Sequence, residues 1–272
     1  MDAITSGGLA MPKLGLGTWQ MRGSACTKAV LDALALGYRH IDTAQMYGNE
    51  AAIGAALAQG GVARAALHLT SKVWPDNLAP AALRRSLEQS LRDLRTPHVD
   101  LYLIHWPTPA MELAPALEAL VRAREEGLVR AVGVSNFPVA LMRRAVEDLG
   151  APIACNQVEY HVLLDQSRVL AYARRHGIAV TAYAPLARGR LEQEPVLQGI
   201  ARRHGATVAQ VALKWLLDQD GVAAIPKASR PENQQANLDA LKLTLDDEDR
   251  AAIAALPRQM RLVQPGWRVD WD

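Results

Sequence analysis

The sequence predicts an α/β protein folded as one (β/α)8 barrel domain over residues 1–272, and three observations carry that prediction. Short apolar runs alternate with longer segments of helical period, which is the pattern of repeated βαβ units. The runs number eight, enough to close a barrel, whereas an open doubly wound sheet usually has about five to seven strands. The length also suits one barrel of roughly 250 residues. An open sheet is the alternative that the pattern favours less.

The expected elements follow in chain order. We expect strands at 14–17, 40–43, 67–73, 101–105, 131–135, 154–158, 179–183 and 223–226. Amphipathic helices such as 80–94 and 111–126 lie between them, and 208–218 and 246–256 are extra helices near the C-terminus. The run from Leu14 to Thr18 has two glycines but lacks the third of a dinucleotide fingerprint, so it is predicted as the first strand. Residues 259–272 are expected to form a loop.

Composition points to a small-molecule enzyme. Lys and Arg total 30 against 28 Asp and Glu, and the net charge of +2 gives no reason to expect nucleic acid or a membrane as partner. No stretch approaches the roughly 20 apolar residues of a membrane span, and no signal peptide is visible. Cys26 and Cys155 show no metal-ligand spacing. We therefore expect a cytoplasmic protein without a metal, and a monomer, since no exposed apolar helix face demands a partner.

Ionisable side chains gather at the ends of the expected strands. Asp42 lies near the end of the second strand, Tyr47 in the following loop, Lys72 in the third strand and His105 at the end of the fourth. In such barrels catalytic groups project from the carboxyl ends of the strands. Buried charges cost stability unless they are paired, so their convergence indicates function, although Asp42 and Lys72 alone could be a structural ion pair.

These four side chains fit the reduction of a carbonyl group. Delivery of hydride to carbon leaves an alkoxide that needs a proton, and Tyr47 can donate it. A nearby Lys72 ammonium is expected to lower the pKa of that phenol, which is ordinarily about 10. Asp42 would keep Lys72 charged and in place, and His105 would orient the carbonyl oxygen.

Six blocks in order along the chain resemble the aldo-keto reductases. They are IDTAQMYGNE at 41–50, TSKVW at 70–74, LIHWP at 103–107, VGVSNF at 132–137, NQVEYH at 156–161 and IPK at 225–227. The chain is most similar to a bacterial group that reduces 2,5-diketo-D-gluconate, with relatives that reduce methylglyoxal. The resemblance implies an NADPH-dependent reductase of small aldehydes, ketones and keto sugars.

The resemblance also implies residue roles. Asp42, Tyr47, Lys72 and His105 match the catalytic tetrad, with Tyr47 as the acid. The implied cofactor-binding residues are Ser135, Asn136 and Gln157 at the carboxamide, Tyr183 stacked on the nicotinamide, and Leu186, Arg188, Gly189, Lys227, Ser229, Arg230, Asn233 and Asn237 further along. The implied aromatic walls of the substrate pocket are Trp19, Trp74 and Trp106, which could instead be core aromatics.

Two questions stay open. Asn233 stands where NADPH-using relatives have an arginine for the 2′-phosphate; Lys227 and Arg230 are cationic and nearby, so NADPH is favoured and NADH is the alternative. The function could also be that of a nucleotide-binding regulatory protein on the same barrel, against which the intact tetrad argues. A phosphate-sugar isomerase is less favoured, because no matching carboxylate and phosphate loop are found.

Overall fold

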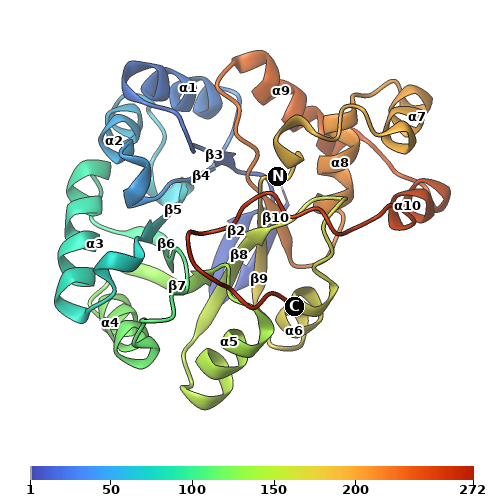
Figure 1. Cartoon of the computed structure of the whole chain (residues 1–272). Helices are drawn as coiled ribbons and strands as arrows, with labels where there is room; N and C mark the ends of the chain where they lie inside the picture. Colours follow the sequence, from blue (N-terminus) through green and yellow to red (C-terminus); the bar gives the residue numbers. More distant parts are fainter. Residues whose placement is uncertain (1) are drawn as a thin grey trace.

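The computed structural model describes residues 2–272 and shows a closed barrel of parallel strands surrounded by helices (Figure 1). Each strand pairs with the next along the chain, from β3 to β10. The two ends of this order meet through parallel bridges of Leu14 with Ala224 and of Gly17 with Lys227. The backbone N–H of Gly15 donates to the Ala224 carbonyl at 2.9 Å across this seam. The predicted barrel is confirmed, and an open sheet is excluded.

The strands and helices have the following bounds. The strands are β1 Ala3–Ser6, β2 Leu9–Pro12, β3 Leu16–Gly17, β4 His40–Asp42, β5 His68–Val73, β6 Val99–Ile104, β7 Val129–Ser135, β8 Ile153–Glu159, β9 Ala179–Tyr183 and β10 Val222–Ala224. The α-helices are α1 Gly23–Ala35, α2 Glu50–Gln59, α3 Pro80–Leu94, α4 Leu113–Glu125, α5 Val139–Arg143, α6 Ser167–Arg175, α7 Pro195–His204, α8 Val208–Leu217, α9 Pro231–Asp239 and α10 Asp247–Ala254. The short helices are η1 Gln45–Tyr47, η2 Arg64–Ala66, η3 Pro75–Asn77, η4 Arg144–Asp148, η5 Ala187–Gly189 and η6 Ala240–Lys242.

The sequence-based boundaries are close to these, and the extra helices α8 and α10 are confirmed. Two of the differences lie at the seam of the barrel. The expected first strand shortens to Leu16–Gly17 and the last ends at Ala224 instead of Pro226. The first and last strand segments lie very close together there: a Cβ on Gly17 would lie 2.5 Å from the carbonyl oxygen of Ile225. The glycines of the Leu14–Thr18 run therefore permit closure of the barrel.

The N-terminal hairpin β1–β2 was not expected from the sequence. Its strands pair antiparallel, and Ser6 Oγ donates to the carbonyls of Ala154 and Gly177 at 2.6 and 2.8 Å. Met11 packs with apolar side chains of the barrel interior. The hairpin therefore closes the end of the barrel at which the strands begin.

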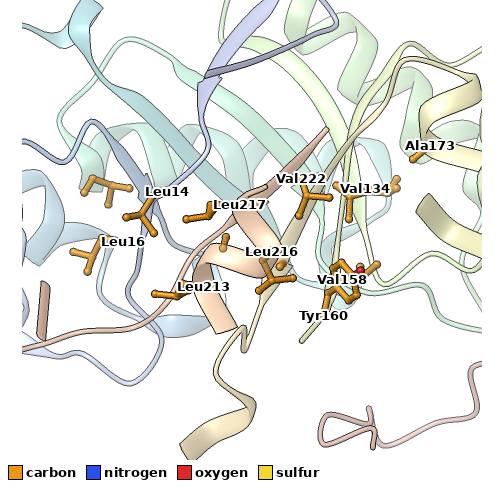
Figure 2. Packing of buried hydrophobic residues seen from close by; sticks show 14 of the residues in the cluster. Leu14, Leu16, Val134, Val158, Tyr160, Ala173, Leu213, Leu216, Leu217 and Val222 are labelled. Carbon is orange, nitrogen blue, oxygen red and sulfur yellow. The ribbon is translucent and has the colours of Figure 1, made fainter. Parts of the chain in front are cut away.

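Alternation along the strands separates two cores. Tyr102 and Ile104 of β6 pack outward against the helices, while Leu101 and Leu103 pack inside the barrel. Figure 2 shows part of the outer core, where leucines of α8 such as Leu216 lie among strand residues. Continuing the inward set one step beyond Leu103 gives His105. The same period of two brings polar side chains from neighbouring strands together above the apolar interior.

The C-terminal residues 259–272 form no helix or strand, as expected for a loop. This segment, red in Figure 1, leaves α10 and crosses the barrel opening before ending near α6. Within residues 2–272, every helix is too short or too polar to cross a lipid bilayer.

Candidate active site

A cavity of about 500 Å³ opens at the carboxyl ends of the strands. It collects most of the residues that the sequence singled out. Those lining it are Trp19, Asp42, Tyr47, His105, Trp106, Ser135, Asn136, Gln157, Tyr183, Leu186, Arg188, Gly189 and Lys227. Seven different strands or their following loops contribute to this list. The position at the carboxyl ends is the usual place of a barrel active site.

Asp42 and Lys72 form a fully buried ion pair beneath the cavity. Lys72 Nζ donates to Asp42 Oδ1 at 2.6 Å and to the Thr43 carbonyl at 2.8 Å. Burial lowers the pKa of the Lys72 ammonium, and the Asp42 carboxylate opposes that shift. Gln157 Nε2 donates to the other oxygen, Asp42 Oδ2, at 2.7 Å. Asp42 thus links strands β4, β5 and β8.

Tyr47 lies at the end of η1 with its ring between Trp19 and His105. The ring centroids are 4.8 Å from Trp19 and 5.6 Å from His105, and Lys72 Nζ lies 5.2 Å from the Tyr47 centroid. Burial raises the pKa of Tyr47 well above its ordinary value, and Asp42 raises it further. This differs from the expected lowering by Lys72. The reason is that Lys72 donates to Asp42 and Thr43, so desolvation dominates.

His105 is a neutral imidazole in this setting. Burial, and then the charge of Lys72, lower the pKa of His105 well below its ordinary value. Trp74 meets the ring edge to face, with centroids 5.2 Å apart and an interplanar angle of 89°. The Nδ1 atom of His105 is buried without a hydrogen-bond partner among residues 2–272. A neutral ring can donate one hydrogen bond into the cavity without bringing a second positive charge close to Lys72.

The residues expected at the nicotinamide carboxamide form one hydrogen-bonded group. Asn136 Nδ2 donates to the His105 carbonyl and to Ser135 Oγ, both at 3.0 Å. Ser135 Oγ donates to the Gln157 carbonyl at 2.7 Å, and Tyr183 Oη donates to Asn136 Oδ1 at 2.7 Å. Asn136 adopts a left-handed φ of 64°, a conformation that asparagine tolerates better than most residues. This network fixes polar side chains beside the Tyr183 ring.

The loop after β9 has an unusual backbone. Ala184, Ala187 and Arg188 adopt φ values of 46°, 46° and 53°, and Gly189 has φ 84°. Left-handed conformations are costly for residues with a Cβ, and such strain gathers at ligand-binding segments. Leu186 is half-buried and Arg188 is exposed at the edge of the cavity.

The remaining cofactor candidates lie at the start of α9. Lys227 Nζ lies 3.5 Å from Ser229 Oγ, and Arg230 and Asn233 are exposed on the same turn. Of these, Lys227 lines the cavity. Asn237 is different: it is buried in α9, three residues after Gln234, whose carbonyl accepts the Tyr38 hydroxyl at 3.0 Å. The structure therefore separates an exposed, cationic end of the site from a packing residue.

The three tryptophans take different places. Trp19 is 40% exposed at the mouth of the cavity, and Trp106 is buried in its wall. Trp74 supports His105 from outside the set of lining residues. The tail adds Trp271, whose ring centroid lies 6.1 Å from that of Trp106.

The cavity wall includes residues that the sequence did not single out individually. Met46, Gln20 and Val263 also line the cavity. Val263 belongs to the tail, which is held by the buried carboxylate of Glu159. The signal was present in the sequence, since Glu159 follows Gln157 by two residues on the same strand face, but the sequence did not show what it binds.

Known proteins resemble this chain over its whole length. The model of the aldo/keto reductase family matches residues 13–258. Methylglyoxal reductase DkgB of Escherichia coli O157:H7 is 46% identical over 97% of this chain and 100% of its own length. The protein of that name from Yersinia pestis is 44% identical with the same coverage. A crystal structure provisionally described as 2,5-diketo-D-gluconic acid reductase B has a TM-score of 0.97 and 44% identity, and covers 100% of this chain and 98% of that one.

Proposed function

The chain belongs to the aldo/keto reductase family, and we propose that it reduces small aldehydes, ketones and keto sugars to alcohols with NADPH. The observation that carries the proposal is the convergence of Tyr47 and His105 on one cavity, above the buried pair of Asp42 and Lys72. Methylglyoxal and 2,5-diketo-D-gluconate are the first substrates to consider, because relatives are named for them.

The residues present suit a nicotinamide dinucleotide phosphate. Amide and hydroxyl groups of Asn136, Gln157 and Ser135 complement a carboxamide, and the Tyr183 ring offers a flat surface beside them. Arg188 at the strained loop suits a pyrophosphate. At the other end, the exposed cations of the Lys227–Asn233 turn and the first N–H groups of α9 suit a 2′-phosphate. The bound nicotinamide would supply the hydride.

The protein's own residues would hold the carbonyl and supply the proton. The neutral His105 donates a hydrogen bond to the carbonyl oxygen and orients it. Tyr47 keeps its proton at neutral pH, because an ordinary phenol has a pKa of about 10 and burial raises the pKa of Tyr47 above that. An alkoxide is a stronger base than a phenolate, so the proton passes from Tyr47 Oη to the substrate oxygen. The Lys72 ammonium, 5.2 Å from the ring centroid, attracts the phenolate that forms and offsets part of the cost of burying it.

Asp42 acts through Lys72, since it keeps the ammonium charged in a dry site. Trp19 and Trp106 provide apolar walls that exclude water from the reacting groups.

The experiment follows the loss of reduced-nicotinamide absorbance with NADPH and then NADH. The substrates are methylglyoxal, 2,5-diketo-D-gluconate and an aromatic aldehyde. We expect Tyr47→Phe to lower kcat on the order of 10²- to 10⁴-fold, the usual contribution of a general acid, and to leave the Kd of NADPH unchanged. Tyr172→Phe is the matched control, because its hydroxyl is buried without a partner among residues 2–272 and lies on α6. Tight nucleotide binding without turnover of any substrate would favour a regulatory protein.

A further inference from the structure

The carboxylate of Glu159 holds the C-terminal tail at the cavity. Glu159 is the last residue of β8 and is fully buried. Its Oε1 accepts the backbone N–H of Leu262 at 2.8 Å and lies 3.1 Å from Nε2 of the buried His161, and its Oε2 accepts the backbone N–H of Val263 at 2.9 Å. Hydrogen bonds to an ionised group are stronger than neutral ones. One side chain of the barrel therefore fixes two consecutive residues of a segment that has no helix or strand of its own.

Other contacts attach the tail on either side of this point. Before it, Met260 N–H donates to the Leu163 carbonyl at 2.8 Å. After it, Trp267 Nε1 donates to the Pro107 carbonyl at 2.7 Å. Between these two attachments Val263 enters the lining of the cavity. The Glu159 contact is thus the one of the three that lies at the wall itself.

Glu159 also stands beside the expected nicotinamide site. It pairs in register with Tyr183 of β9 and follows Gln157 by two residues. Burial raises the pKa of Tyr183 well above its ordinary value, and the negative charge of Glu159 is the next cause. Glu159 therefore connects the surface expected to bind the nicotinamide with the wall that Val263 forms.

We propose that Glu159 is a positioning residue that sets substrate selectivity, because its carboxylate fixes Leu262 and Val263 so that Val263 walls a pocket sized for small carbonyl compounds. This inference rests on the proposed reductase function. With the wall in place, a small aldehyde keeps its contacts and a bulky one is excluded. When the wall loosens, the small substrate binds less well and the bulky one is admitted.

Glu159→Gln is the informative change. The amide has the same shape, but its oxygen can accept only one of the two N–H groups, and its NH₂ then faces the other donor. We expect the KM for methylglyoxal to rise roughly tenfold, about 1.4 kcal/mol, while the KM for an aromatic aldehyde falls. The kcat for methylglyoxal and the Kd of NADPH should each change by no more than about twofold, well below the tenfold change expected for the KM.

Asp100→Asn is the matched control. Asp100 is also a buried strand carboxylate that accepts a backbone N–H, that of Leu69 at 2.9 Å, but it lies near the start of β6 at the opposite end of the barrel. It should lower stability without changing the ratio of the two KM values. An equal change of that ratio in both variants would overturn the proposal.

A double-mutant cycle tests the route through the wall. Val263→Ala alone should also shift the KM ratio, and Glu159→Gln with Val263→Ala should shift it little more than either single change. Additive effects would show that Glu159 does not act through Val263.

Hydrogen exchange separates this inference from the proposed function. Glu159→Gln should speed exchange of the amides of residues 262 and 263, and Asp100→Asn should not. Unchanged exchange at these two amides would show that Glu159 does not hold the tail in place. A wild-type protein without turnover would overturn the reductase function and the selectivity role, while exchange would still decide whether Glu159 holds the tail.

Discussion

The change Asp42→Asn would leave the Lys72 ammonium without its counter-charge in the protein interior. Lys72 is 0% exposed and Asp42 1% exposed. Removing one partner of a buried ion pair costs about 3–5 kcal/mol. Lys72 can avoid the charge by releasing its proton, but deprotonating an amine of ordinary pKa, about 10.4, at pH 7 costs about 4.6 kcal/mol at 1.36 kcal/mol per unit. Keeping the charge and releasing the proton cost similar amounts of free energy, so we expect the free energy of unfolding at pH 7 to fall by about 3–5 kcal/mol.

The sign of the pH dependence follows from Lys72. Burial lowers its pKa in the folded protein, so between that lowered value and about 10.4 the unfolded chain binds more protons. Stability therefore rises with pH in this window. Without Asp42 the folded pKa falls further, and the window widens toward lower pH. The deficit of Asp42→Asn should consequently be smaller at pH 9 than at pH 7.

Urea denaturation at both pH values measures this, with methylglyoxal turnover as the functional readout. The double variant Asp42→Asn with Lys72→Met removes the unpaired charge, and it should recover most of the stability but none of the activity. A loss below about 1 kcal/mol, the worth of an exposed ion pair, or the absence of rescue by Lys72→Met, would refute the account of a dry, paired ammonium.

Two further predictions concern pH and cofactor choice. Burial and then the charge of Lys72 lower the pKa of His105. We therefore expect kcat/KM to stay level as the pH falls through about 6.5, the ordinary pKa of histidine. A fall of kcat/KM around that pH would contradict a neutral His105 imidazole. Because the pKa of His105 is lower in the folded protein than in the unfolded chain, the unfolded chain binds the histidine proton first as the pH falls. The stability that the neutral His105 contributes is therefore present above about 6.5 and is lost below it. Asn233→Arg should lower the Kd of NADPH roughly tenfold, and Arg230→Ala should raise it by a similar factor, with the Kd of NADH little changed in fluorescence titrations. Equal changes for both cofactors would place these residues away from the 2′-phosphate.

Much of the site follows from local sequence pattern. The alternation of apolar runs and helical segments predicted the strands, and the helix at 80–94 coincides with α3 Pro80–Leu94. Because side chains alternate along a strand and catalytic groups of a barrel lie at the carboxyl ends, Asp42, Lys72 and His105 could be expected to meet. The ion pair of Asp42 and Lys72 is present as expected.

The rest depended on contacts between distant parts of the chain. Closure of the barrel pairs Leu14 with Ala224. Hydrogen bonds join the backbone N–H of Val263 to Glu159, and Gln157 to Asp42. The raised pKa of Tyr47 depends on how much water the folded walls exclude.

The sequence by itself determined the class of fold and the chemical groups at the strand ends, because periodicity and strand direction are local properties. Only the tertiary structure decided which partner each group has and how dry its surroundings are. Hydrogen bonds and desolvation depend on distances of a few ångströms between residues far apart in sequence, and these distances are set by strand register and by the closure of the barrel.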